Sequence, residues 1–65
     1  MSNAWSRVGK RDKFKLNMEL DHSWVVQKDG AKWFVYRDGI AQIDTWYMDA
    51  QKAMEAAEKS AGVVG

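Results

Sequence analysis

Few side chains in this sequence are able to do acid–base or nucleophilic chemistry. His22 is the single histidine, it follows Asp21 in a turn-prone stretch, and cysteine is absent. A histidine and a carboxylate need a nucleophile to make a catalytic triad. The serines stand in tails, a turn and a helix end rather than in a strand-to-helix elbow: Ser2, Ser6, Ser23 and Ser60. We therefore interpret His22 as a polar turn residue and expect no catalytic residue and no enzyme activity.

Binding sites for metals and phosphates are also missing from the pattern. No group of histidines or carboxylates has the spacing of a metal site, and no glycine-rich loop has the form that cradles phosphates. Gly30 and Gly39 each follow an aspartate, where a hairpin turn accounts for them. We expect no metal and no cofactor.

The chain of 65 residues is long enough for one small domain. Residues 1–15 hold five basic residues against Asp12, a balance of +4, while the whole chain has a net charge of +1. We interpret residues 1–13 as a basic flexible tail and residues 14–62 as the folded domain. No long apolar run suggests a signal peptide or a membrane span. We expect a cytoplasmic location, in a bacterial host if the protein is phage-encoded.

Alternating or β-prone runs predict strands over four stretches: 14–20, 24–28, 31–37 and 40–47. The pairs Asp29-Gly30 and Asp38-Gly39 predict two-residue hairpin turns between the last three. Alanines at helical spacing predict a helix from about 49 to 61, with Asp49 as N-cap and Gly62 as C-cap. The predicted fold is α+β: an antiparallel meander of three or four strands with one C-terminal helix packed on one face.

The two turns predict which side chains share a face of the sheet. If Lys28 pairs with Ala31, and Arg37 with Ile40, directly opposed residues lie on the same side. One face then carries Val25, Phe34, Tyr36, Ala41, Ile43 and Tyr47. The other carries Trp24, Val26, Trp33, Val35, Ile40 and Trp46. Both faces are apolar, and one helix covers only one of them.

The strand over 14–20 decides which face forms the core. A tight hairpin at Asp21-His22 pairs Met18 with Val25 and adds the leucines to the Phe34 face, where we expect the helix. One unbroken strand over 14–28, or a slip of one residue, puts the even-numbered positions on the tryptophan face instead. With the hairpin, the uncovered face is the predicted partner-binding face: Trp24, Val26, Trp33, Val35 and Trp46. Alternatively, the N-terminal arm folds back and covers it with Trp5 and Val8.

Basic residues near this sheet suggest nucleic-acid binding as a second candidate function. Aromatic side chains on a sheet stack on unpaired bases, while lysine and arginine hold phosphates. The candidate nucleic-acid contacts are Arg7, Lys10, Arg11, Lys13, Lys15, Lys28 and Arg37.

Part of the chain has a familiar pattern. The segment WVVQKDGAKWFVYRDG, then Thr45, then DAQKAMEAAEKSA resembles short β–β–α modules of uncharacterised bacterial and phage proteins. It is more loosely similar to AP2-type and integrase arm-binding domains, which place a three-stranded sheet in DNA. That second resemblance implies a DNA-contacting role for Arg37 and its neighbours.

Together these features predict a small non-enzymatic protein-interaction module. It would bind a partner, or a second copy of itself, through an aromatic sheet face or an exposed strand edge. Size and resemblance suggest a phage or mobile-element accessory protein. The alternative is nucleic-acid binding through the sheet face and the basic N-terminal arm.

Overall fold

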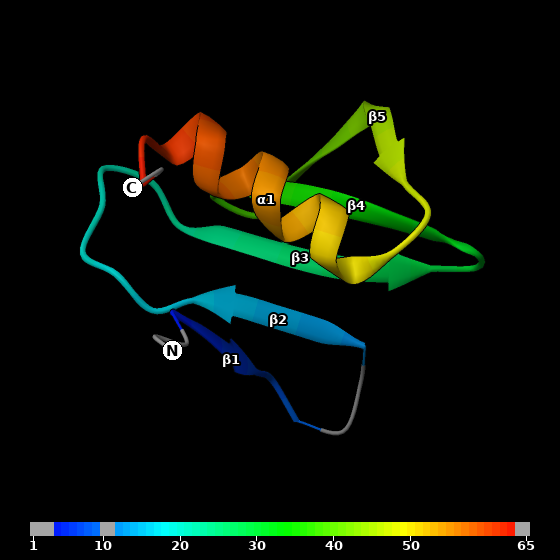
Figure 1. The fold of residues 1–65 in the computed structure, drawn as a ribbon, viewed down its shortest axis with the longest axis horizontal. Coiled ribbons are helices and arrows are strands. Elements are labelled where there is room, and N and C mark those ends of the chain that lie inside the picture. Colours follow the sequence, from blue (N-terminus) through cyan, green and yellow to red (C-terminus); the bar gives the residue numbers. More distant parts are fainter. Residues whose placement is uncertain (1–3, 10–11, 64–65) are drawn as a thin grey trace.

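The computed structural model describes residues 4–9 and 12–63, which form a five-stranded antiparallel sheet with one helix packed on it (Figure 1). The strands lie side by side in chain order. The elements are β1 (Trp5–Arg7), β2 (Lys13–Leu16), β3 (Trp24–Asp29), β4 (Lys32–Arg37), β5 (Ile40–Tyr47) and α1 (Ala50–Ala61). The predicted α+β class and the antiparallel meander with a C-terminal helix are confirmed. The expected number of strands was too small by at least one.

The second Asp-Gly pair closes the hairpin of β4 and β5 as predicted. Asp38 and Gly39 have φ angles of 54° and 82°, and Arg37 pairs with Ile40. Both central residues thus adopt the left-handed conformation that matches the twist of a tight hairpin.

The first Asp-Gly pair is used differently. The two loop residues between β3 and β4 are Gly30 and Ala31, so Asp29 pairs with Lys32 and Val26 pairs with Val35. Each pairing is shifted by two residues from the predicted ladder. Since side chains alternate with a period of two, an even shift leaves every residue of β3 and β4 on its predicted side.

Strand β2 pairs with β3 in a register that the predicted hairpin does not produce. Phe14 lies opposite Val26 and Lys15 opposite Val25, and residues 17–23 form a seven-residue connection instead of a tight turn. Compared with the predicted pairing of Met18 with Val25, the shift is three residues. An odd shift exchanges the sides, so Phe14 and Leu16 join the tryptophan face.

Strand β1 adds an edge to the sheet from residues assigned to the tail. Trp5 lies opposite Leu16, and its side chain is 7% exposed. The indole Nε1 donates a hydrogen bond of 2.7 Å to a carboxylate oxygen of Glu58 in α1. The alternative in which the N-terminal arm folds back over the tryptophan face is therefore observed for Trp5, whereas Val8 is 38% exposed.

Strand β5 carries an irregularity in its middle. Tyr36 pairs with Ala41, but Phe34 pairs with Trp46, so the four residues 42–45 lie opposite Val35 alone. The strand rises away from the sheet at this bulge (Figure 1). Because the number of extra residues is odd, the side chains of β5 after the bulge point to the opposite side of the sheet from the one predicted for an unbroken strand. Trp46 therefore lies opposite Phe34, not on the side of Trp33.

Helix α1 has the predicted bounds and caps. The carboxylate of Asp49 accepts a 2.8 Å hydrogen bond from the backbone N–H of Lys52, and Gly62 ends the helix with a φ of 79°. Ala53 and Ala57 are completely buried against the sheet. Small side chains at these positions allow the helix backbone to come close to the large side chains below it.

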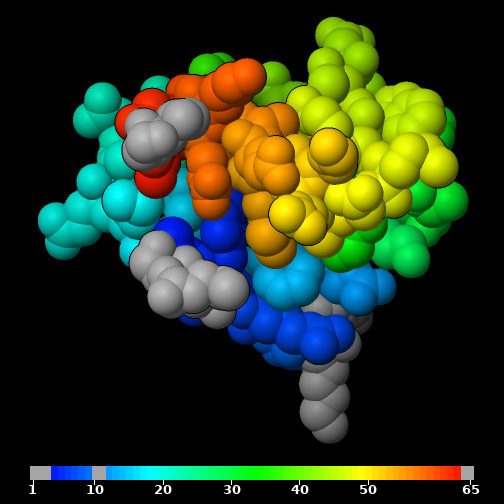
Figure 2. Space-filling model, in the orientation of Figure 1, coloured from blue at the N-terminus to red at the C-terminus, as the bar shows by residue number. Residues whose placement is uncertain are grey.

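The helix covers the tryptophan face, so the predicted position of the core is wrong. The core consists of Trp5, Leu16, Trp24, Val26, Trp33, Val35, Ala53 and Ala57. Phe14, Leu16 and Trp5 all add apolar volume to this side, and the helix packs where that volume is largest. In the space-filling view α1, in yellow to orange, and β5, in yellow-green, lie above the blue residues of β1 and β2 (Figure 2).

Candidate functional site

The sheet face opposite the helix has an aromatic centre. Val25 pairs with Tyr36, Tyr36 with Ala41 and Phe34 with Trp46, and directly opposed residues share a side. These five residues therefore form one surface, which we call the open face: Val25, Phe34, Tyr36, Ala41 and Trp46. Trp46 is 44% exposed and the other four are partly buried. No described helix covers them.

Lysines surround this aromatic centre. Lys13 pairs with Gln27 and Lys15 with Val25, which places both lysines on the open face. Lys32 precedes Trp33 in β4, so the two side chains point to opposite sides of the sheet and Lys32 lies on the side of Phe34. The Nζ of Lys32 is 4.7 Å from the centre of the Trp46 ring. Asp29 lies opposite Lys32 in the β3–β4 ladder and adds a carboxylate to this face. The open face therefore has three lysines beside its aromatic centre.

His22 has a structural partner. Its Nδ1 lies 2.6 Å from a carboxylate oxygen of Asp38, and the other oxygen of Asp38 accepts a 2.8 Å hydrogen bond from the backbone N–H of Ser23. These hydrogen bonds, that of Ser23 foremost, hold the pKa of Asp38 below its usual value. The contacts join the 17–23 connection to the β4–β5 turn.

Within residues 4–9 and 12–63, no three histidine or carboxylate side chains are grouped so as to hold a metal ion. In the same residues, no helix is both long and apolar enough to cross a membrane.

The predicted partner-binding face is mostly core. Trp24, Val26, Trp33 and Val35 are between 0% and 9% exposed beneath α1, so the prediction of an uncovered surface at these four residues is wrong. Trp46 alone among the predicted five lies on the open face. The cause is the combination of the odd shift in β2 and the bulge in β5.

The candidate nucleic-acid contacts are divided between the two sides of the sheet. Lys13 and Lys15 lie on the open face. Lys28 pairs with Trp33 and Arg37 with Trp24, so both lie on the helix side. Arg7 is opposite Phe14 on that same side and is 3.8 Å from Asp12. Lys10 and Arg11 lie outside the described residues.

Four residues of the open face, and Lys32 beside it, were not predicted as site residues: Val25, Phe34, Tyr36 and Ala41. The sequence did place Phe34 and Tyr36 on one face, but as core under the helix. Lys32 was identifiable only with the bulge in β5, because the pairing of Phe34 with Trp46 brings the Trp46 ring to the side of Lys32.

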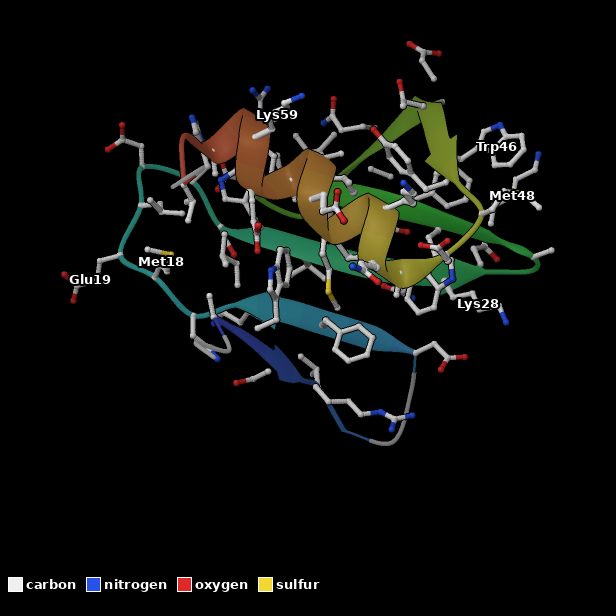
Figure 3. The ribbon with its side chains drawn as sticks, in the orientation of Figure 1. Met18, Glu19, Lys28, Trp46, Met48 and Lys59 are labelled. Atoms are coloured by element: carbon white, nitrogen blue, oxygen red, sulfur yellow. The ribbon has the colours of Figure 1, made fainter. Side chains whose placement is uncertain are left out.

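The edges of the sheet are poorly suited to pairing with another strand. Strand β1 has three residues, and β5 is interrupted by its bulge. Short or bulged edge strands are common protections against edge-to-edge association. Apolar side chains do gather along β5 and its end, where Ile40, Ile43 and Met48 are 67%, 73% and 75% exposed. Trp46 and Met48 lie at the end of the sheet that also holds Lys28 (Figure 3).

Comparisons with protein families, curated proteins and solved structures found no match to this chain. The resemblance to β–β–α modules and to arm-binding domains stays a prediction.

Proposed function

We propose that this protein is a non-enzymatic module that binds single-stranded nucleic acid through the open face. The observation that carries the proposal is the combination, on the uncovered side of the sheet, of Phe34, Tyr36 and Trp46 with the lysines 13, 15 and 32. Unpaired bases stack on aromatic rings regardless of sequence, and lysines neutralise the backbone beside them.

The geometry suits an extended strand of nucleotides. Phe34 and Tyr36 are two residues apart on β4, about 7 Å along the strand. Trp46 is directly opposite Phe34 on β5. Bases stacked on these rings would place their phosphates toward the margins, where Lys13 and Lys15 lie on β2 and Lys32 at the start of β4. A duplex offers no unpaired base faces, which is why we propose a single strand.

Charge also favours an anionic partner over a second copy of the chain. Two open faces brought together would place six lysines in one contact. Like charges in a desolvated contact oppose association.

Fluorescence anisotropy of a labelled oligothymidine and of a labelled duplex, each at two salt concentrations, tests the proposal. We expect the single strand to bind more tightly, with affinity falling as salt rises. The slope of log K against log[salt] should decrease in magnitude by about 0.7 for each lysine among 13, 15 and 32 that is changed to Gln. Trp46→Ala should weaken binding by about 5- to 150-fold, the loss of about 1–3 kcal/mol from one stacked base.

Lys52→Gln and Lys59→Gln are matched controls, because both lysines lie on α1, on the other side of the sheet. Lys59 is remote from Trp46 (Figure 3). If these variants reduce the salt slope as much as the open-face variants do, binding is non-specific. Absence of salt-dependent binding in the wild type would refute the proposal.

The second candidate function is a protein-interaction module. The exposed Ile40, Ile43 and Met48 favour it, since large apolar side chains exposed along one strand can contribute to a protein interaction site. The test compares a wild-type bait with an Ile43→Ser/Met48→Ser bait in the source cell. A partner that is captured by both baits equally does not bind this surface.

A further inference from the structure

A cleft of about 390 Å³ opens on the helix side of the sheet, away from the open face. Its walls are the second half of α1 and the bulge of β5, and the end of β4 lies between them. The lining residues on which its chemistry depends are Trp24, Val35, Arg37, Thr45, Tyr47 and Ser60. Ligand pockets are commonly about 300–1,000 Å³ in volume, so the cleft fits a small molecule.

The bulge of β5 explains why the cleft exists. Residues 42–45 bulge opposite Val35, so β5 does not pair with that part of β4. The helix does not fill the space, because the residues it presents there, Ala56 and Ser60, are small. Val35 and Trp24 remain as an apolar floor and are 6% exposed each.

The polar groups of the cleft suit an anion. Arg37 is the one lining residue with a permanent charge, and no carboxylate is among the lining residues. The nearby Asp38 is engaged with His22 and Ser23. Within the described residues, no ion pair to the Arg37 guanidinium is present, and its charge adds only a minor contribution to the lowered pKa of Asp38. Thr45, Tyr47 and Ser60 add hydroxyl groups around it.

We propose that this cleft binds a small organic anion that has one planar ring. Its carboxylate or phosphate pairs with the fork of donors on Arg37, and its ring lies on Val35 and Trp24. Guanidinium groups hold carboxylates and phosphates through paired hydrogen bonds. The site is independent of the proposed function, since its residues lie on the other side of the sheet.

An NMR titration of the ¹⁵N-labelled protein tests the inference with two matched pairs of probes. Indole-3-acetate and uridine monophosphate carry the anionic groups, and indole-3-acetamide and uridine are their neutral analogues. We expect an anionic probe to shift the amide signals of Thr45, Tyr47 and Ser60 and the indole signal of Trp24. The neutral analogue should bind at least about tenfold more weakly. Which anionic probe binds tells a carboxylate ligand from a phosphate ligand.

Two variants probe the site itself. Arg37→Gln should weaken binding at least about tenfold, whereas Lys59→Gln, with the same loss of charge, should leave it unchanged. Ala56→Leu should reduce binding by filling the cleft without a change in charge, and a well-dispersed spectrum shows that each variant is folded. Equal binding of neutral and anionic probes, shifts centred on Phe34 and Tyr36, full affinity in Arg37→Gln, or no shifts at millimolar probe would each overturn the inference.

Discussion

At the scale of single residues, two tryptophans of the same sheet have opposite roles. Trp33 on β4 is 9% exposed beneath α1, with its ring centre 6.1 Å from that of Phe14. Trp46 on β5 is 44% exposed, and its ring contacts the ammonium group of Lys32. The first therefore contributes to stability, and the second is available to a ligand.

Replacing each tryptophan with alanine should separate the two roles. Trp33→Ala should lower the free energy of unfolding by about 3–5 kcal/mol, because a large core side chain is lost. A domain of this size has a total stability of only about 3–10 kcal/mol, so much of the protein would unfold. Trp46→Ala should cost about 1 kcal/mol or less. Urea denaturation followed by circular dichroism measures both, and equal losses would contradict the assignment of the two faces.

Asp38 should make the stability depend on pH in the acid range. Its pKa is lowered in the folded protein from a usual value of 3.8, with the hydrogen bond from Ser23 as the largest cause. A lowered pKa stabilises the fold above the unfolded-state value, and this contribution is lost as the pH falls through the folded-state pKa. Asp38→Asn, which tolerates the positive φ, should therefore melt below the wild type at pH 7. The difference in Tm should shrink below about pH 3.8. A constant difference across this range would show that the charge of Asp38 is not involved.

At the scale of elements, the sequence predicts local structure better than pairing. The helix from about 49 to 61 and its caps were predicted because alanine spacing, Asp49 and Gly62 agree. The turn at Asp38-Gly39 was predicted because few residues besides Asn, Asp and Gly readily adopt positive φ. Gly30-Ala31 replaced Asp29-Gly30 as the first turn, yet the shift by two residues preserved the faces.

The open face was not predictable, because it also depends on how strands pair. The connection over 17–23 has no turn signal as strong as Asp-Gly, and its length decides whether Phe14 and Leu16 face the helix. The bulge over 42–45 likewise has no glycine to mark it, and its odd length moves Trp46 to the open face. Two odd shifts therefore exchanged the predicted core and the predicted surface.

The N-cap of α1 offers a test of one element by itself. Asp49→Ala removes the oxygen that accepts from the N–H of Lys52, and we expect a loss of about 1 kcal/mol in the free energy of unfolding. Asp44→Ala, the same change in the bulge of β5, is the control and should have less effect. Chemical denaturation of both variants provides the comparison. A similar loss in both would mean that overall charge, and not the cap, is responsible.

At the scale of the whole molecule, the lysines of the open face should keep copies of the protein apart. Sedimentation over a concentration series at low salt should show a 7.5 kDa monomer. A variant with Lys13, Lys15 and Lys32 all changed to Gln should self-associate more, because the aromatic face loses its repulsion. A wild-type dimer, or a variant that stays strictly monomeric, would show that these charges do not control association.

The contact between Trp5 and Glu58 has a consequence for biosynthesis. The two residues are 53 positions apart, and the helix that covers the core follows all five strands in the chain. During synthesis the strands leave the ribosome before α1 does, because they precede it in the chain. Trp24, Val26, Trp33 and Val35 then have no cover. Exposed apolar strands are prone to aggregation. The apolar side of the sheet therefore stays uncovered until the residues around Glu58 emerge and the helix packs onto it.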